Sequence, residues 1–159
     1  LYSFILTLQL DQFLGSRSKL HGSFNWVGSD GNNTMVIGTD KAEDIENEPI
    51  LNWYKELFEN VLSTEDCRLL ITGYGFKDPH INKIILESIN KKRGLSIYII
   101  CRAEPEDFMN ETLKNIGCKK DQDTFSNAIK AYYPTFEKLI PFNKPQREFN
   151  KLIEQFFRS

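Results

Sequence analysis

Cysteine is scarce in this chain, and its spacing excludes two classes of small domain. The three cysteines, Cys67, Cys101 and Cys118, are odd in number and lie far apart, so none belongs to a C-x-x-C pair. A disulfide framework needs paired cysteines, and a cysteine zinc site needs closely spaced thiols. We therefore predict neither disulfides nor a metal site, and a reducing cytoplasm is the compartment that suits these thiols.

Long apolar runs are absent as well. No stretch approaches the ~18 apolar residues that span a bilayer, and the segment at residues 1–14 is interrupted by Gln9, Asp11 and Gln12. A segment broken in this way is neither a signal peptide nor an anchor. We expect a soluble, cytoplasmic protein without a membrane partner.

The chain also lacks an excess of charge of one sign. It contains 20 Lys and Arg residues against 22 Asp and Glu residues, for a formal net charge of -2, and the basic residues form no dense tract. Proteins that bind a phosphate backbone neutralise it with clustered Lys and Arg side chains. Direct nucleic-acid binding is therefore not predicted.

What the chain does contain is enough apolar material for one core. Its 159 residues are 40% hydrophobic and 13% aromatic, which predicts a single domain over residues 1–159. The chain opens at Leu1 without a methionine, directly on an apolar run at residues 1–8 that is typical of a buried strand. We interpret the chain as a piece of a longer protein.

Hydrophobic spacing in the middle of the chain predicts alternating helices and strands. An amphipathic helix follows Pro49, and beyond it strands at residues 69–73 and 95–101 alternate with helices at residues 79–91 and from Pro105 onward. A strand, a helix and a second strand in this order form a right-handed parallel unit. The fold class predicted from this order is α/β with a parallel sheet. The apolar face of the first helix consists of Leu51, Tyr54, Leu57, Phe58, Val61 and Leu62.

Four further segments have clear local signals. Turn-forming residues at 27–33 precede a predicted strand at 34–38, and residues 41–48 form a solvated acidic loop. A short helix is predicted at residues 125–132 and a terminal helix at residues 147–157. One side of the terminal helix carries Phe149, Leu152, Ile153, Phe156 and Phe157, and this face suits either the core or an interface.

The most informative segment is K-L-H-G-S-F-N-W at residues 19–26, because it contains one of only two histidines. His21 ends a predicted strand formed by Lys19 and Leu20, and Gly22 leaves space beside it. An imidazole in such a position titrates near neutral pH and can act as a general base. The alternative is a buried histidine with satisfied hydrogen bonds.

The second informative segment, residues 69–82, contains the other histidine. Gly73 and Gly75 lie where a strand ends and a helix is about to begin, so their missing Cβ atoms allow backbone N–H groups to approach a ligand. Asp78 suits the N-cap position of the helix, and Pro79 suits its first turn. The alternative is a tight turn with ordinary capping, since the third glycine of a dinucleotide motif is missing.

For His80 and for the aromatic residues near the first helix, a role in packing is the first interpretation. His80 falls at the second helical position, where the helix dipole disfavours its charged form, so it is either a neutral hydrogen-bonding group or a packing residue. The aromatic residues near the first helix have spacings that favour core packing over a stacking surface. These aromatic residues are Trp26, Trp53, Tyr54 and Phe58.

Three segments together resemble the sirtuin-like (silent information regulator-like) NAD-binding superfamily, in particular its zinc-free bacterial branch found in antiphage defence proteins. K-L-H-G-S at residues 19–23, with Trp26, resembles the catalytic histidine motif of that family, and residues 69–82 resemble its G-Y-S-F-x-D-x-H-I-N segment. T-L-Q-L-D at residues 7–11 falls at the position of the T-x-N-x-D motif, whose asparagine contacts the nicotinamide ribose region. Gln9 stands at the position of that asparagine.

The chain departs from the family pattern in three places. The side chain of Gln9 is one methylene longer than asparagine, and a displacement near 1 Å costs on the order of a hundredfold in rate. The opening strand and Gly-Ala-Gly phosphate loop of the family have no counterpart after Leu1, so the chain resembles roughly the later two thirds of the domain. Arg102 follows the later strand, where sirtuins place an asparagine facing the adenosine.

The resemblance implies a fold and a function. The fold is a Rossmann-like, three-layer parallel sheet with flanking helices, incomplete at its N-terminus. The function is hydrolysis of NAD to nicotinamide and ADP-ribose in a bacterial antiphage protein, and the missing zinc-binding cysteine quartet argues against a protein deacetylase. The alternative is a catalytically degenerate module that binds NAD or ADP-ribose or promotes oligomerisation. Either reading implies a homo-oligomer or further domains of a longer parent chain as partners.

The same resemblance, with the chemistry of the residues, assigns candidate site residues. Departure of nicotinamide leaves an oxocarbenium-like ribose, which His21 assists by polarising a ribose hydroxyl or water, while Gln9 and Asp11 orient that end of the nucleotide. The residues predicted to bind the nucleotide lie in the three motifs and after the later strand. They are Thr7, Gly22, Ser23, Gly73, Tyr74, Gly75, Phe76, Asp78, His80 and Arg102.

Overall fold

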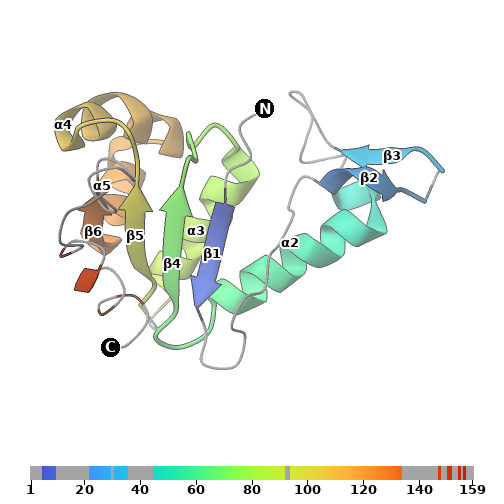
Figure 1. The fold of residues 1–159 in the computed structure, drawn as a ribbon, viewed down its shortest axis with the longest axis horizontal. Helices are drawn as coiled ribbons and strands as arrows, with labels where there is room; N and C mark the ends of the chain where they lie inside the picture. The colour runs from blue at the N-terminus through green and yellow to red at the C-terminus, as the bar shows by residue number, and fades with distance from the viewer. Residues whose placement is uncertain are drawn as a thin grey trace.

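The structure is an α/β fold with a four-stranded sheet and a separate two-stranded sheet (Figure 1). The computed structural model describes residues 5–9, 22–29, 31–35, 45–91 and 94–133, together with residues 147, 150, 151, 154 and 156. The elements in chain order are β1 Ile5–Gln9, β2 Gly22–Val27, β3 Asn33–Met35, α2 Pro49–Leu62, β4 Arg68–Thr72, α3 Pro79–Asn90, β5 Ser96–Ile100, α4 Pro105–Asp107, the π-helical turn η1 Phe108–Thr112, the 3-10 turn η2 Leu113–Ile116, α5 Lys119–Ala128 and β6 Ile129–Tyr133.

Strands β4, β5 and β6 form the parallel part of the larger sheet. Thr72 of β4 lies opposite Ile100 of β5, and Ile100 lies opposite Tyr133 of β6. Helix α3 connects β4 to β5, so the predicted parallel strand, helix, strand unit is confirmed. The carboxyl ends of all three strands therefore lie at one edge of the sheet, which we call the carboxyl edge.

Strand β1 joins the sheet next to β4 but runs in the opposite direction. Ile5 lies opposite Thr72 and Gln9 lies opposite Arg68, so the sheet as a whole is mixed. An apolar run such as residues 5–8 suits both parallel and antiparallel ladders, because strand direction depends on how the chain returns and not on composition. Only the tertiary structure therefore shows that Gln9 lies at the edge opposite the carboxyl edge.

The two faces of the sheet bury alternate residues of each strand. Leu69 and Ile71 of β4, with Ile97 and Ile99 of β5, pack on the face covered by the helices. On the opposite face Tyr98, Ile100 and Tyr133 surround Phe156, which is fully buried. Because successive side chains of a strand point to opposite sides, β5 is buried on both. The helices, the sheet and the segment with Phe156 thus form three layers, as predicted for a Rossmann-like fold.

The terminal helix predicted at residues 147–157 is described at five positions. The backbone is helical at residues 147, 150 and 151 and continues in a π conformation at 154 and 156. The carbonyl of Phe156 accepts a hydrogen bond of 3.0 Å from Nη1 of Arg68. Phe156 therefore belongs to the core of this chain, while Phe149, Leu152, Ile153 and Phe157 lie outside the described residues.

Helix α2 confirms the amphipathic pattern after Pro49. It buries Leu51, Phe58, Val61 and Leu62, but Trp53 is 55% exposed, so its predicted assignment to the core is wrong. At 100° per residue, Trp53 lies about 200° around the helix from Leu51, on the side away from the core.

The start of α2 holds the smaller sheet. The ring of Tyr54 stacks on Trp26 of β2, with centroids 5.1 Å apart, and Glu48 accepts hydrogen bonds of 3.0 Å from both the backbone N–H and the hydroxyl of Ser29. Ser29 belongs to the turn between β2 and β3, which the hydrogen bond from the N–H of Gly28 to the carbonyl of Asn32 closes over 2.7 Å. The turn predicted at residues 27–33 is therefore confirmed.

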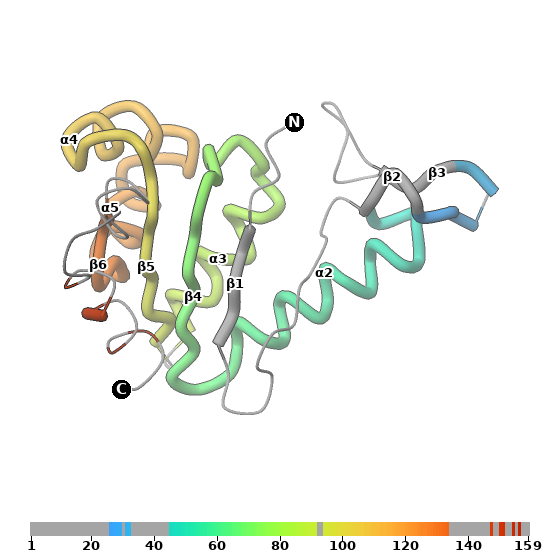
Figure 2. Tube along the Cα trace, viewed as in Figure 1, coloured from blue at the N-terminus to red at the C-terminus, as the bar shows by residue number. Residues whose placement is uncertain are grey.

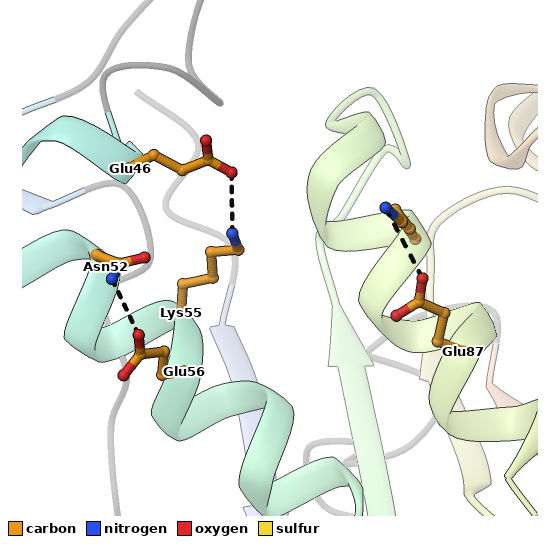
Figure 3. A network of polar contacts seen from close by, with 6 residues as sticks. Glu46, Asn52, Lys55, Glu56 and Glu87 are labelled. Atoms are coloured by element: carbon orange, nitrogen blue, oxygen red, sulfur yellow. Dashed lines mark hydrogen bonds and ion pairs between the residues drawn. The ribbon is translucent and has the colours of Figure 1, made fainter.

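Of two predictions near this hairpin, the acidic loop needs correction, and the strand lies partly outside the described residues. Residues 45–47 are helical and Ile45 is 1% exposed, so the end of the predicted acidic loop packs into the protein. Lys55 of α2 binds Glu46 over 3.1 Å and ties this turn to the helix (Figure 3). The predicted strand at 34–38 is described only as β3, whose last residue is Met35, and residues 19–21 lie outside the described residues.

The predicted helix at residues 125–132 is wrong in its second half. Helix α5 begins at Lys119 and ends at Ala128, and residues 129–133 form β6. The carboxylate of Asp121 accepts a hydrogen bond of 3.1 Å from the N–H of Cys118, which starts the helix early. Three of the five residues that follow, Ile129, Tyr132 and Tyr133, are β-branched or aromatic, and parallel pairing with β5 overrides their helical spacing. By contrast, the helix predicted from Pro105 is confirmed as α4 and continues into η1 and η2.

The path of the chain determines which loops lie together. Figure 2 shows that α2 leads into the amino end of β4, at the bottom of the view, whereas the turn from β4 into α3 lies at the top. Within the described residues, no helix combines the length and the apolar character that a membrane crossing requires.

Candidate functional site

Two loops begin side by side at the carboxyl edge of the sheet. The first, residues 73–78, connects β4 to α3, and the second, residues 101–104, follows β5. Because Thr72 and Ile100 are partners in adjacent parallel strands, both loops leave the sheet at the same level (Figure 1). In open α/β sheets ligands bind at this edge, outside the carboxyl ends of the strands.

The backbone of the first loop enters the left-handed region at a glycine and again at a phenylalanine. Gly73 has a φ of 67°, in the left-handed region that glycine tolerates without strain. Phe76 has a φ of 56° and holds this conformation as a non-glycine residue. At Gly75 a Cβ would meet only Cγ of Lys77, at 4.0 Å. The loop is therefore sharply curved, and its backbone is open to solvent at Gly75.

A buried asparagine of α3 holds this curvature. Asn82 is 3% exposed, and its Nδ2 donates hydrogen bonds to the carbonyl of Phe76 over 2.8 Å and to the carbonyl of Asn115 over 3.1 Å. Its Oδ1 accepts a hydrogen bond from the hydroxyl of Tyr74 over 2.8 Å. Both amide hydrogens and the oxygen of this side chain are thus used within the protein. The loop is fixed by α3 and η2 together.

Asn115 of η2 makes a second contact with the same loop. Its Nδ2 donates to the carbonyl of Gly75 over 3.0 Å, although the two residues are 40 positions apart. Two consecutive carbonyls of the loop, those of Gly75 and Phe76, are therefore bound by asparagine side chains.

The aromatic side chains of the loop belong to the core. Tyr74 is 5% exposed and Phe76 is 1% exposed, and the Phe76 ring packs edge to face against Phe108 and Phe125 at centroid distances of 5.8 and 5.1 Å. Burial and the neighbouring charge of Asp78 raise the pKa of Tyr74 well above its ordinary value, so its hydroxyl remains a donor. These two residues have only backbone atoms to offer to a ligand.

The start of α3 follows the predicted order. Asp78 occupies the N-cap position and Pro79 the first turn, but the Asp78 side chain makes no capping hydrogen bond to the helix. Its backbone carbonyl accepts hydrogen bonds from the N–H groups of Ile81 and Asn82, each over 3.1 Å. It also lies 3.2 Å from the hydroxyl of Tyr74, whose single proton is shared between this carbonyl and the nearer Oδ1 of Asn82. His80 lies at the second helical position and is half-buried.

The second loop carries an exposed cation. Arg102 follows β5 and is exposed. The next residue, Ala103, is fixed because its carbonyl accepts a hydrogen bond of 2.7 Å from the hydroxyl of Tyr132 in β6. Burial is the largest of the effects that raise the pKa of Tyr132, so this hydroxyl stays a donor at neutral pH.

Comparison with known families agrees with this geometry. A family model described as a SIR2-like domain matches residues 18–131. The chain belongs to the SIR2-like domain family. The match spans both histidine motifs and the carboxyl edge of the sheet, and it confirms the resemblance to a sirtuin-like domain with a Rossmann-like fold. No curated protein and no solved structure matches the chain. SIR2-like domains bind NAD in general, so the family supports an NAD-related function.

The SIR2-like domain brings together only part of the predicted site. Gly73, Gly75, Asp78 and His80 lie in or beside the first loop, and Arg102 lies in the second. Gly22 and Ser23 belong to β2, which Figure 1 shows beyond the start of α2, away from the turn between β4 and α3.

The residues of the T-x-N-x-D position are distributed along β1. Thr7 lies opposite Leu70, and Gln9 lies opposite Arg68 at the amino end of β4. At about 3.3 Å per residue, Gln9 is about 13 Å along the strand from the level of Thr72. The structure therefore does not bring Gln9 to the glycine turn. His21 and Asp11 lie outside the described residues, so their roles stay predictions.

Three residues that shape the site, Asn82, Asn115 and Tyr132, were not predicted from the sequence. Asn82 ends the segment that resembles the family, but nothing in its neighbours shows that its side chain binds the loop behind it. Asn115 lies in η2 between Lys114 and the buried Ile116, and its partner Gly75 is 40 positions away, so no local pattern indicates the contact.

Proposed function

We propose that this SIR2-like domain binds NAD at the carboxyl edge of its sheet and hydrolyses it to nicotinamide and ADP-ribose. The observation that carries the proposal is the family match over residues 18–131, which includes both the K-L-H-G-S motif and the curved loop at residues 73–78. A loop of this kind at the end of a parallel strand, followed by a helix, suits the phosphates and riboses of a dinucleotide.

The residues of the edge have complementary roles in binding. Helix α3 begins directly after the loop, and its N-terminus contributes partial positive charge. The open backbone at Gly75 allows a ligand to approach closely. Arg102, exposed on the adjacent loop, supplies a full positive charge for the anionic nucleotide. Binding should therefore weaken as the ionic strength rises.

The proposed reaction is a substitution at the ribose carbon C1′. The bond from C1′ to the nicotinamide nitrogen breaks, and its electron pair goes to the nicotinamide ring. The oxygen of a water molecule forms the new bond to C1′, and that water releases one proton to the solvent. His21 is proposed to polarise a ribose hydroxyl or the water as positive charge develops on the ribose, with Gln9 and Asp11 orienting that end of the nucleotide.

The test is a nicotinamide-release assay on the full-length protein and on His21→Ala. Loss of turnover with unchanged NAD affinity is expected for His21→Ala, because the imidazole acts in the chemical step. Lys83→Ala is the matched control, since the side chain of Lys83 is exposed on α3, where its ammonium pairs with Glu87 over 3.9 Å. Turnover by folded His21→Ala at the wild-type rate would remove His21 from the mechanism.

The second candidate function is a module that senses NAD or ADP-ribose, or supports oligomerisation, without catalysis. Gln9 favours this second function for two reasons. Its side chain is longer than the family's asparagine, and its place in the sheet is opposite Arg68, at the amino end of β4 and away from the glycine turn. Calorimetry beside the nicotinamide assay separates the two functions. Binding of NAD without release of nicotinamide supports the sensor, and release supports the hydrolase.

We further propose that the parent protein acts in the bacterial cytoplasm as an antiphage NAD hydrolase and works as a homo-oligomer or with other domains. The support is the resemblance of the three motifs to that branch of the family. Cells expressing the full-length protein should lose NAD on phage infection, and cells expressing His21→Ala should keep it. Light scattering on the purified protein measures its oligomeric state.

A further inference from the structure

Asn115 lies outside the three motifs at residues 7–11, 19–26 and 69–82, yet it binds the loop at the carboxyl edge. It sits in η2, which follows the π-helical turn η1 after β5. Its side chain is exposed, and its Nδ2 donates a hydrogen bond of 3.0 Å to the carbonyl of Gly75, which is exposed as well. This contact joins the segment after β5 to the turn after β4.

The two asparagines act on consecutive peptide groups. Asn115 binds the carbonyl of Gly75, and Asn82 binds the carbonyl of Phe76. No cis peptide bond occurs in the described residues, and in a trans peptide the N–H points opposite to the carbonyl of the same group. Fixing these two carbonyls therefore directs the N–H groups of Phe76 and Lys77 away from the asparagines.

Those two N–H groups have no competing partner in the described part of the chain. Neither Phe76 nor Lys77 donates its backbone N–H to a carbonyl or side chain there. Successive N–H groups on either side of a left-handed residue form a concave binding site for anionic oxygens. Phe76, with its φ of 56°, is such a residue.

We propose that Asn115 is a positioning residue, which together with Asn82 holds the N–H groups of Phe76 and Lys77 in the orientation that binds anionic oxygens of NAD. This inference rests on the proposed function, because it names how the loop holds the nucleotide. Asn115 does not touch the nucleotide itself. It acts through the peptide group between Gly75 and Phe76.

The chain offers a clean way to separate positioning from folding. Replacing Asn82 removes three hydrogen bonds, two of them buried, and endangers the fold, whereas Asn115→Ala removes one bond and keeps the backbone carbonyl that binds Asn82. Asn115→Asp keeps the shape but has no hydrogen to donate. Asn110, an exposed asparagine of η1 with no side-chain hydrogen bond among the described residues, provides the matched controls Asn110→Ala and Asn110→Asp.

The experiment combines amide NMR without ligand and NAD titration on the full-length protein. In Asn115→Ala and Asn115→Asp the Gly75 carbonyl and Phe76 amide resonances shift before NAD is added. The Kd for NAD rises about fivefold to tenfold, the change expected when a misoriented Phe76 N–H loses about one hydrogen bond to the nucleotide. Both Asn110 variants keep the wild-type resonances, and their Kd for NAD stays within about twofold of wild type. Asn110→Asp is the control for the negative charge that Asn115→Asp adds. Thermal unfolding of both Ala variants checks that each is folded at the temperature of the titration.

Each of the other outcomes contradicts a different part of the proposal. Wild-type affinity in a variant whose Phe76 resonance has shifted makes the bond purely structural and ends the positioning role. An unshifted Phe76 resonance shows that Asn115 does not orient the peptide. Failure of the wild-type protein to bind NAD overturns the proposed function, and the positioning role falls with it.

Discussion

The hydroxyl of Tyr74 donates a hydrogen bond to Oδ1 of Asn82 over 2.8 Å, inside the core. This bond joins the loop after β4 to the helix that follows it. It also fixes which way the amide of Asn82 points, because the Oδ1 must face the hydroxyl and the Nδ2 must face the carbonyl of Phe76. The curvature of the loop therefore depends on a phenol that sequence reasoning assigned to ligand binding.

Tyr74→Phe tests this relationship. The substitution keeps the ring that packs at 4.7 Å from Phe76 but leaves Oδ1 of Asn82 without this donor. We expect a loss of about 1–3 kcal/mol in the free energy of unfolding, measured by urea denaturation. Stability equal to wild type would show that the hydroxyl is not needed to hold Asn82.

Gly73→Ala tests the conformational demand at the start of the loop. Gly73 has a φ of 67°, and a Cβ there meets no atom within 4 Å, so backbone strain is the only cost. We expect a loss of about 1 kcal/mol in unfolding free energy. Gly75→Ala is the matched comparison, because Gly75 lies outside the left-handed region and a Cβ there only touches Lys77 at 4.0 Å. An equal loss in both variants would contradict this explanation.

The pH dependence of stability at alkaline pH reports on Cys67. This thiol is fully buried, and burial raises its pKa from 9.0 to about 11. Between these values the folded protein retains a proton that the unfolded chain has released, so the contribution to stability present below pH 9 is lost as the pH rises toward 11. Urea unfolding over this range should show a shallower decline for Cys67→Ala than for wild type. Parallel declines would mean that the thiol does not contribute.

The same burial predicts the order of thiol reactivity. Cys118 is exposed and Cys67 is buried, and both are free. Because the thiolate is the reactive species, a chromogenic disulfide reagent should modify Cys118 rapidly and Cys67 only on unfolding. Mass spectrometry of the partly labelled protein identifies the site, and early labelling at Cys67 would show that its environment opens readily.

Two of the aromatic residues of α2, Phe58 and Trp53, should differ in how much they contribute to stability. Phe58 is 1% exposed, so Phe58→Ala should cost about 3–5 kcal/mol of unfolding free energy. Trp53 is 55% exposed and contacts Tyr54 edge to face at 4.9 Å, so Trp53→Ala should cost less than about 1 kcal/mol. Chemical denaturation measures both, and a large loss for Trp53→Ala would indicate that this ring packs against a part of the chain outside the described residues.

The local sequence determined the elements whose signal is their own periodicity. The apolar spacing after Pro49 fixed α2, and the alternation of strand and helix from residue 69 to residue 101 fixed the parallel unit of β4, α3 and β5. Its glycines and Asp78 also marked the loop between β4 and α3. These signals are short in range, so they can be recognised without knowing which elements pack together.

Tertiary structure alone decided the features that depend on distant partners. The direction of β1, which carries Gln9 to the far edge of the sheet, follows from how the chain returns to β4. The strand at β6 replaces a predicted half-helix because β5 offers it a parallel partner. Asn115 reaches Gly75 only because η2 folds back over the carboxyl edge. A hydrogen bond between residues so far apart depends on the packing of all the elements between them, and no spacing in the sequence encodes it.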